Sequence, residues 1–194
     1  MSETSGGENA FPELLTERLR LRRIIASDVS AVLDLFGDER VVEFYDLARF
    51  TSPDQAEKMI SQFDEMHAAR KGIRWAITLR SEDRLIGTCG FNEWLKISRR
   101  GTLGYDLTPS HWNHGYMTEA LRAVMDYGFK EMNLNRLEAY VMSGNLGSIQ
   151  LLRKLGFQLE GVLRQRGFWK GAFHDLQLFA SLREDAMVQG KEWG

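Results

Sequence analysis

Residues 105–119 read YDLTPSHWNHGYMTE, and this stretch decides the fold of the chain. A strand-like run ends at Thr108-Pro109, because proline cannot donate a hydrogen bond within a sheet. A polar loop with Gly115 follows, and then apolar residues recur at helical spacing, at Leu121, Val124, Met125 and Phe129. The first amides of such a helix lack partners within it and carry the positive end of its dipole. The stretch predicts a phosphate-binding loop before a helix, although many α/β proteins have this order and bind nothing there.

Length and composition limit the class of protein. The 194 residues fit one domain with its own hydrophobic core. A net charge of −2, from 25 basic and 27 acidic residues, points to no direct nucleic-acid partner. Cys89 is the single cysteine, which excludes an intrachain disulfide and fits a reducing compartment. Since no apolar run has the length of a membrane span, we expect a cytoplasmic protein without a membrane partner.

Both ends of the chain are polar. Residues 1–12 are rich in Ser, Gly and Glu and lack the basic start and apolar core of a signal peptide. We therefore expect a flexible tail over residues 1–12, a single domain over residues 13–184, and a polar C-terminal tail over residues 185–194.

Hydrophobic periodicity gives the remaining elements. It predicts strands over residues 18–24, 75–79, 84–95, 101–107, 136–142, 157–168 and 173–182, and helices over residues 29–37, 53–70, 116–132 and 146–155. Short turns between the second, third and fourth strands favour an antiparallel meander, in which Gly87 and Gly90 indicate a bulge or a close backbone neighbour. The strand–helix–strand order around residues 116–132 implies a parallel pair. The pattern predicts a mixed α/β fold.

Several short motifs carry a resemblance that is specific in their order and spacing, although each is weak alone. They are Thr16–Arg22, Leu85–Gly87, Gly104–Leu107, His111–Ala120, Asn145–Ser148, Lys154–Phe157, Glu160-Gly161 and His174-Asp175. From about Thr16 to Leu182 the chain resembles the GCN5-related N-acetyltransferase (GNAT) superfamily, and most of all its RimJ/RimL-like branch of ribosomal-protein N-terminal acetyltransferases. The resemblance implies a mostly antiparallel sheet of about seven strands, with a parallel pair around a CoA cleft and about four flanking helices.

The same resemblance implies transfer of an acetyl group from acetyl-CoA directly to a primary amine, without a metal. The pyrophosphate is expected on the loop residues Asn113, His114, Gly115, Tyr116, Met117 and Thr118. The pantetheine is expected beside the strand backbone at Tyr105 and Leu107, with a hydrogen bond to Asn145. Ser148 is the expected general acid, which protonates the departing thiolate. Without the resemblance, Asn145 and Ser148 read as ordinary helix-capping residues.

Four positions depart from the family pattern. Trp112 stands where the loop usually has Gln or Arg, and Met117 where it has Gly or Ala. Thr102 and Gly167 stand where the usual carboxylate bases would be. The base therefore stays open between Asp106 and Glu93 as leading candidates, Glu43, and a chain of water molecules.

Charge suggests an acceptor. Between Asp34 and Glu65 there are nine acidic and three basic residues, which would attract a cationic amine or a basic protein, although solvated helix faces explain them equally well. Some of the late basic residues could meet the 3′-phosphate of CoA: Arg153, Lys154, Arg164, Arg166 and Lys170. His111 and His114, without a nearby cysteine, are expected to face solvent or phosphate instead of a metal.

We expect a protein N-terminus as the amine acceptor, with a small amine or an amino-sugar antibiotic as the runner-up. A non-catalytic acyl-CoA-binding module, suggested by Thr102 and Gly167, and a protein that binds another nucleotide are the alternatives of a different class. The chain is expected to be a monomer, or a homodimer formed through the sheet edge and the aromatic hairpin around Trp169.

Overall fold

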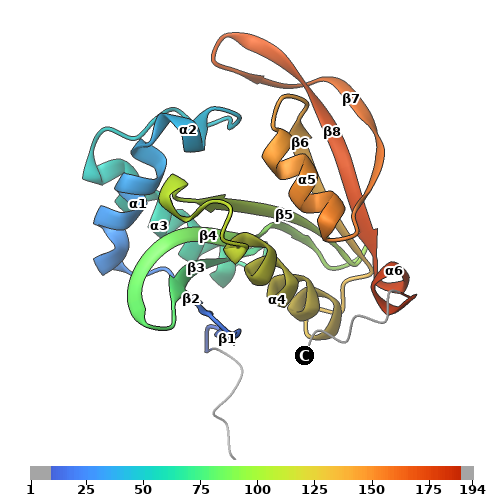
Figure 1. Cartoon of the computed structure of the whole chain (residues 1–194), viewed down its shortest axis with the longest axis horizontal. Helices are drawn as coiled ribbons and strands as arrows, with labels where there is room; N and C mark the ends of the chain where they lie inside the picture. Colours follow the sequence, from blue (N-terminus) through green and yellow to red (C-terminus); the bar gives the residue numbers. More distant parts are fainter. Residues whose placement is uncertain (1–9, 189–194) are drawn as a thin grey trace, which may run out of the picture.

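The computed structural model describes residues 10–188, which form one eight-stranded sheet with helices on both faces (Figure 1). The strands are β1 (Leu14–Leu15), β2 (Leu19–Arg23), β3 (Ile73–Leu79), β4 (Glu82–Leu95), β5 (Arg100–Leu107), β6 (Arg136–Met142), β7 (Gln158–Trp169) and β8 (Ala172–Leu182). The α-helices are α1 (Val29–Gly37), α2 (Glu39–Val42), α3 (Pro53–Ala68), α4 (Tyr116–Lys130), α5 (Leu146–Lys154) and α6 (Arg183–Val188). The predicted mixed α/β fold is confirmed. The sequence analysis missed β1, α2 and α6, which are too short to show periodicity.

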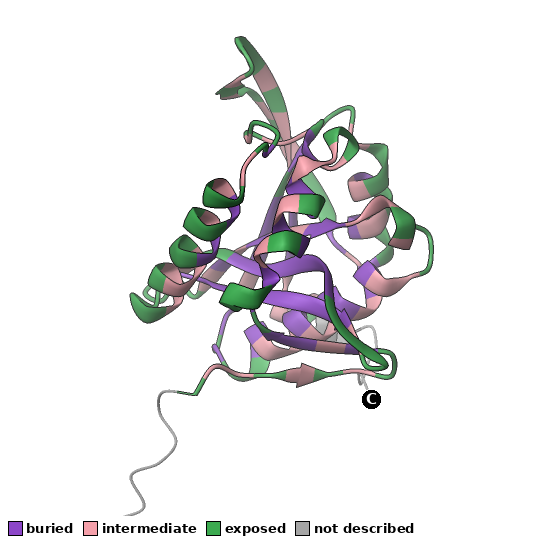
Figure 2. Cartoon of the chain, turned by 90° about the vertical axis from the view of Figure 1, so that its left-hand side faces the viewer, coloured by how far each residue is buried: buried purple, intermediate pink, exposed green. Residues whose placement is uncertain are grey.

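Alternation along the strands builds one hydrophobic core on each face of the sheet. In β3, Trp75 and Ile77 face the core under α4 and α5, whereas Ala76 faces the core under α1 and α3. This is the period-two pattern of a sheet that is covered on both sides. Figure 2 shows the consequence, with buried residues along the central strands and exposed residues on the outer faces of the helices.

Gly90 allows β3 and β4 to approach each other closely. Its φ is +154°, and an added Cβ would lie 2.1 Å from the carbonyl oxygen of Ile73. A Cβ on Gly87 would lie 2.3 Å from the carbonyl oxygen of Asp106 on the other neighbouring strand. The predicted close backbone neighbours are therefore confirmed at both glycines.

The parallel pair is short, and this creates the central opening of the molecule. β5 and β6 pair only at Arg100↔Arg136, Gly101↔Leu137 and Thr102↔Glu138, and every other strand pair is antiparallel. Beyond Thr102, β5 continues beside β4 up to Leu107, while β6 continues beside β8 up to Met142. The two strands therefore diverge, and within residues 10–188 the edge of β5 that faces β6 has no strand partner beyond Thr102.

The ends of the domain differ from the expected boundaries. Phe11 packs on His67 with ring centroids 4.9 Å apart, and the carbonyl of Pro12 accepts a hydrogen bond from the Trp75 indole at 2.7 Å. The tail predicted over residues 1–12 is corrected at these positions, because they are attached to the core; residues 1–9 lie outside the described part. Helix α6 reaches Val188 into the predicted C-terminal tail, of which residues 189–194 also lie outside it. No helix between residues 10 and 188 is long and apolar enough to cross a membrane.

Candidate functional site

The divergence of β5 and β6 opens a cavity of about 870 Å³. Its walls come mainly from the ends of β5 and β6, the loop before α4, the start of α5, residues 40–46 around α2, and Trp169 and Leu176 of the β7–β8 hairpin. It brings together most of the predicted site residues, namely Tyr105, Asp106, Leu107, Asn113, Gly115, Tyr116, Met117, Thr118, Asn145 and Ser148. His114 and Glu93 do not line it, whereas Glu43 does.

The loop before α4 has the backbone of an anion site. Gly115 is the N-cap residue with a φ of 79°, and Asn113 has a φ of 63°, so both lie in the left-handed region. Among the described residues, no capping side chain bonds to the first turn of α4, whose intrahelical hydrogen bonds begin with the amide of Glu119. The amides of Tyr116, Met117 and Thr118 therefore point out of the helix end toward the cavity side, together with the positive end of the dipole.

Arg18 supports this loop, and the sequence analysis did not assign it a role. Its guanidinium donates to the carbonyl of His114 at 3.0 Å and lies over the Tyr116 ring at 4.7 Å. Arg18 also pairs with Glu119 at 2.7 Å, and Thr16 donates to the same carboxylate at 2.6 Å. Burial alone would raise the pKa of Glu119, but these hydrogen bonds outweigh it and lower the pKa. The turn between β1 and β2 is thereby attached to the start of α4, and a cation lies beside the loop amides.

The two departures within the loop have structural explanations. The Trp112 indole donates to the carbonyl of Leu107 at 2.7 Å, which ties the loop to the end of β5. The Met117 side chain is only 8% exposed and belongs to the core under α4. The methionine side chain therefore packs mainly into the core, although Met117 also contributes to the lining of the cavity.

Ser148, Asn145 and Tyr105 meet where the cavity passes the start of α5. The Asn145 side chain caps α5 by accepting from the Ser148 amide at 3.1 Å, as its helix-capping interpretation predicted. The Tyr105 hydroxyl is buried and makes no hydrogen bond with the described residues. Burial raises the pKa of Tyr105 to about 12, and the neighbouring Ser148 hydroxyl acts in the opposite direction. Two hydroxyl groups thus lie together at the N-terminus of a helix.

The two leading carboxylates occupy different environments. Asp106 is buried on the α3 face of β5, where its Oδ2 accepts hydrogen bonds from Arg74 and Thr88. Burial raises the pKa of Asp106, and Arg74 works against this rise. The side chain of Glu93 is 51% exposed and pairs with Arg100 at 3.6 Å outside the cavity. Of these two carboxylates, Asp106 lines the cavity and Glu93 does not.

Arg74, which sequence reasoning missed, is the buried partner of Asp106. It also donates to Asn92 at 2.7 Å, and an added Cβ on Gly104 would lie 2.4 Å from its guanidinium. The glycine that precedes Tyr105 therefore makes room for this arginine across the strand. No local pattern could have shown it, because Arg74 and Asp106 are 32 residues apart.

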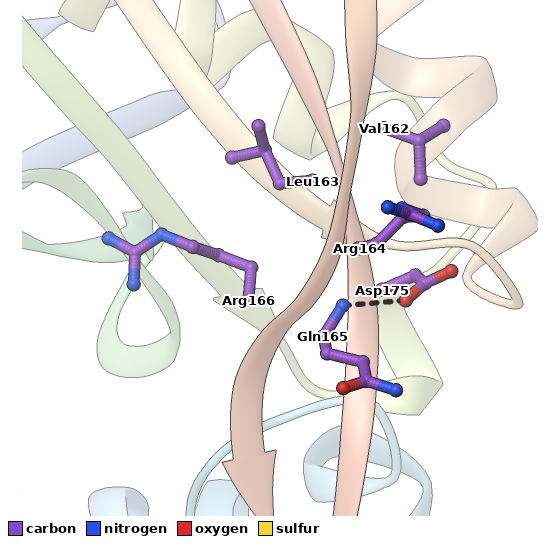
Figure 3. A pocket seen from close by; sticks show the side chains of 6 residues that line it. All are labelled: Val162, Leu163, Arg164, Gln165, Arg166 and Asp175. Carbon is purple, nitrogen blue, oxygen red and sulfur yellow. Dashed lines mark hydrogen bonds between the residues drawn. The ribbon is translucent and has the colours of Figure 1, made fainter.

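The basic residues of the C-terminal part, predicted as candidates for the 3′-phosphate of CoA, lie in different places. Lys154 lines the cavity, whereas Lys170 bonds to the carbonyl of Val42 at 2.7 Å. Arg164 and Arg166 lie on a bulge of β7 that lines a separate hollow (Figure 3). Within residues 10–188 no three His, Cys, Asp or Glu side chains are placed to hold a metal ion.

Comparisons with known proteins agree with this geometry. Residues 18–158 match the family model of the acetyltransferase (GNAT) domain. The uncharacterized N-acetyltransferase YoaA of Bacillus subtilis (strain 168) is 38% identical over 173 residues, which are 89% of this chain and 98% of that protein. The ribosomal-protein-serine acetyltransferase of Escherichia coli (strain K12) is 30% identical over 113 residues, 58% of this chain and 63% of that protein.

A solved structure, RimL, the ribosomal L7/L12 alpha-N-protein acetyltransferase in complex with coenzyme A, has the same fold. Its TM-score is 0.79 at 24% identity, over 86% of this chain and 95% of that one. The sheet that diverges around a cavity, the loop with unpaired amides before α4 and these matches lead to one conclusion: the chain belongs to the GNAT family of acetyltransferases.

Proposed function

We propose that the protein transfers the acetyl group of acetyl-CoA to a primary amine, and that the amine is the N-terminus of a protein. One observation carries the proposal: an unpaired strand edge on β5 runs from the anion-binding loop before α4 to Ser148 at the start of α5. A linear molecule with a phosphate group at one end and a thioester at the other fits this order of binding groups.

The residues present fit acetyl-CoA. The amides of Tyr116, Met117 and Thr118, with Arg18 beside them, would hold the pyrophosphate. The free edge of β5 between Tyr105 and Leu107 would pair with the amide groups of pantetheine, as an added strand would. Lys154 is the late basic residue placed to meet a phosphate of CoA at the cavity.

The reaction forms an N–C bond and breaks the C–S bond of the thioester. Ser148 would donate its hydroxyl proton to the departing thiolate, and the positive end of the α5 dipole would stabilise negative charge at that point. The proton of the attacking ammonium must leave before or during attack. Asp106 would accept it, since its Oδ1 takes no hydrogen bond from the described residues and its pKa is raised by burial.

The acceptor would enter from the side of α2, where Glu43 and Asp46 line the cavity. Their negative charge favours the approach of an ammonium group. A protein acceptor is supported by the name of the ribosomal-protein-serine acetyltransferase, 30% identical to this chain. A small amine is the second candidate, because the same two carboxylates would attract it. We also propose a cytoplasmic location, which suits the single cysteine.

The test is transfer of acetyl from acetyl-CoA to a panel of amines, followed by mass spectrometry of each acceptor. The panel contains peptides that start with Ser, Ala or Met, a polyamine and an aminoglycoside. Acetylated peptide is the expected product. Acetyl-CoA that binds but is transferred to none of these amines would indicate a binding module, and displacement by ATP at equal concentration would indicate another nucleotide ligand.

The assignment of the base has its own matched pair of variants. Asp106→Asn keeps a hydrogen-bond acceptor for Arg74 but cannot take a proton, so we expect a rate at least about a hundredfold lower. Glu93→Gln changes a carboxylate that lies outside the cavity, and its rate should stay near that of the unmodified protein. Equal rates in the two variants would refute the role of Asp106.

A further inference from the structure

The β7–β8 hairpin bends at a bulge halfway along its length (Figure 3). Between the pairs Leu163↔Leu176 and Gly167↔His174, residues 164–166 of β7 lie opposite Asp175 alone. Asp175 fixes the bulge by accepting a hydrogen bond from the Gln165 amide at 2.7 Å. Because a bulge bends a strand and increases its twist, the outer part of the hairpin leans toward α2 (Figure 1).

The tip of the hairpin is attached to the segment that lines the acceptor side of the cavity. The Lys170 ammonium donates to the carbonyls of Val42 at 2.7 Å and Glu43 at 3.3 Å, at the C-terminal end of α2. Cations are favoured at such a helix end. Lys170 and Gly171 have φ values of 50° and 76°, as a two-residue hairpin turn requires. The tip is therefore attached to the end of α2 beside the cavity.

Trp169 is held in one orientation at this tip. Its ring lies across Gly167, where an added Cβ would be 1.8 Å from the ring carbon Cζ3. The same ring stacks on His174, with centroids 4.3 Å apart and an angle of 24° between the planes. Gly167 is the position at which a carboxylate base was considered, and its missing side chain is what gives the indole its place. The indole lines the cavity on the side of α2.

The surroundings of Trp169 are apolar. The neighbouring lining residues on this side are Val41, Phe44, Tyr45, Met142 and Leu176. Burial of an apolar group of the acceptor against such a wall is favourable, whereas a polar group would lose its water there. The charged lining residues on this side are Glu43, Asp46 and Arg40; all three are exposed to solvent, and Arg40 pairs with Asp38 at 2.6 Å.

We propose that Trp169 is an acceptor-binding residue, whose indole selects amines attached to a large apolar group, such as a protein N-terminus that begins with Met. The inference rests on the proposed transfer to an amine and goes beyond it by naming the chemistry next to that amine. It also gives the hairpin tip a role, since Lys170, Gly167 and His174 act by positioning the indole.

The experiment is a competition between two peptides that differ only in their first residue, Met or Ser, with limiting acetyl-CoA. The ratio of acetylated products gives the ratio of kcat/KM. We expect the unmodified protein to prefer Met by at least about tenfold, the discrimination that an apolar pocket typically achieves. Trp169→Ala should bring the ratio near one, and Trp169→Phe should keep most of the preference.

Gly167→Ala is the second, independent variant, because the added Cβ displaces the indole without removing it. It should lower the preference as Trp169→Ala does. Phe168→Ala and Phe173→Ala are matched controls on the same tip: both rings are 63% exposed, pack on each other at 4.8 Å and lie outside the cavity. They should leave the ratio unchanged, and the Kd of acetyl-CoA should be the same in all these variants.

The outcomes are distinct. A Met preference that persists in both Trp169→Ala and Gly167→Ala overturns the inference and leaves the proposed function intact. Preference of the unmodified protein for the Ser peptide, or for spermidine added as a third competitor, also overturns it. Binding of acetyl-CoA without transfer to any of the three overturns the proposed function, and this inference with it.

Discussion

Removing one partner of the buried Arg74–Asp106 pair should cost far more stability than removing both. The two side chains are 1% and 3% exposed. In Asp106→Ala the guanidinium stays buried with only neutral partners, Thr88 and Asn92. A buried charge that loses its counter-ion typically costs about 3–5 kcal/mol, a large share of the roughly 5–15 kcal/mol that stabilise a domain. We expect Arg74→Met to cost a similar amount, because it leaves the carboxylate unpaired.

The double variant Arg74→Met/Asp106→Ala contains neither charge. It should be more stable than either single variant by about 2 kcal/mol or more, although it lacks both side chains. Urea unfolding at neutral pH, followed by tryptophan fluorescence and circular dichroism, measures the free energy of unfolding of the four proteins. Additive effects, or a loss below about 1 kcal/mol in Asp106→Ala, would refute a buried, mutually dependent ion pair between Arg74 and Asp106.

Three further predictions concern other parts of the site. Tyr105→Phe should raise the free energy of unfolding by about 1 kcal/mol in urea titrations, because it removes a buried hydroxyl without a partner; a loss would contradict this. Glu119 has a lowered pKa, so its contribution to stability is present above its ordinary value of 4.5 and is lost as the pH falls. Glu119→Gln should therefore lose less stability than the unmodified protein between about pH 5 and pH 3, and equal slopes would exclude this role. Lys170→Met should raise the KM for a peptide acceptor about fivefold, because it removes a hydrogen bond with a net free energy of about 1 kcal/mol. The Kd of acetyl-CoA should stay constant, and a changed Kd would show that the hairpin tip also affects the acetyl-CoA side of the cavity.

Local sequence signals were sufficient where the structure is set by near neighbours. The proline after β5, Gly115 and the helical stripe that follows them predicted the loop and the start of α4. Asn145 predicted the cap of α5 in the same way, because a helix N-terminus is determined within a few residues. Short segments such as β1 and α2 have too few residues to show a period.

Contacts across the sheet could not be predicted from one sequence. β6 pairs with β5 at only three positions, whereas it pairs with β8 along its whole length. Because β8 is distant in the chain, the divergence of β5 and β6 could not be predicted from the sequence. Arg74 lay just outside the strand predicted over residues 75–79, and only the register of β3, β4 and β5 places it beside Asp106. From the sequence, Gly167 was interpreted only as a position that lacks the usual carboxylate base. Its contact with the Trp169 ring could not be predicted, because the position of that ring depends on the bend of the hairpin.

The central claim is transfer of acetyl to an amine with Ser148 beside the leaving sulfur. The most direct measurement is release of free thiol from acetyl-CoA with a peptide acceptor, for the unmodified protein and for Ser148→Ala. We predict peptide-dependent release that falls at least about tenfold in the variant, with an unchanged Kd for acetyl-CoA, as expected when an acid catalyst is lost. Equal release by the two proteins would exclude Ser148 as the acid, and no release from bound acetyl-CoA with any amine would contradict the proposed function.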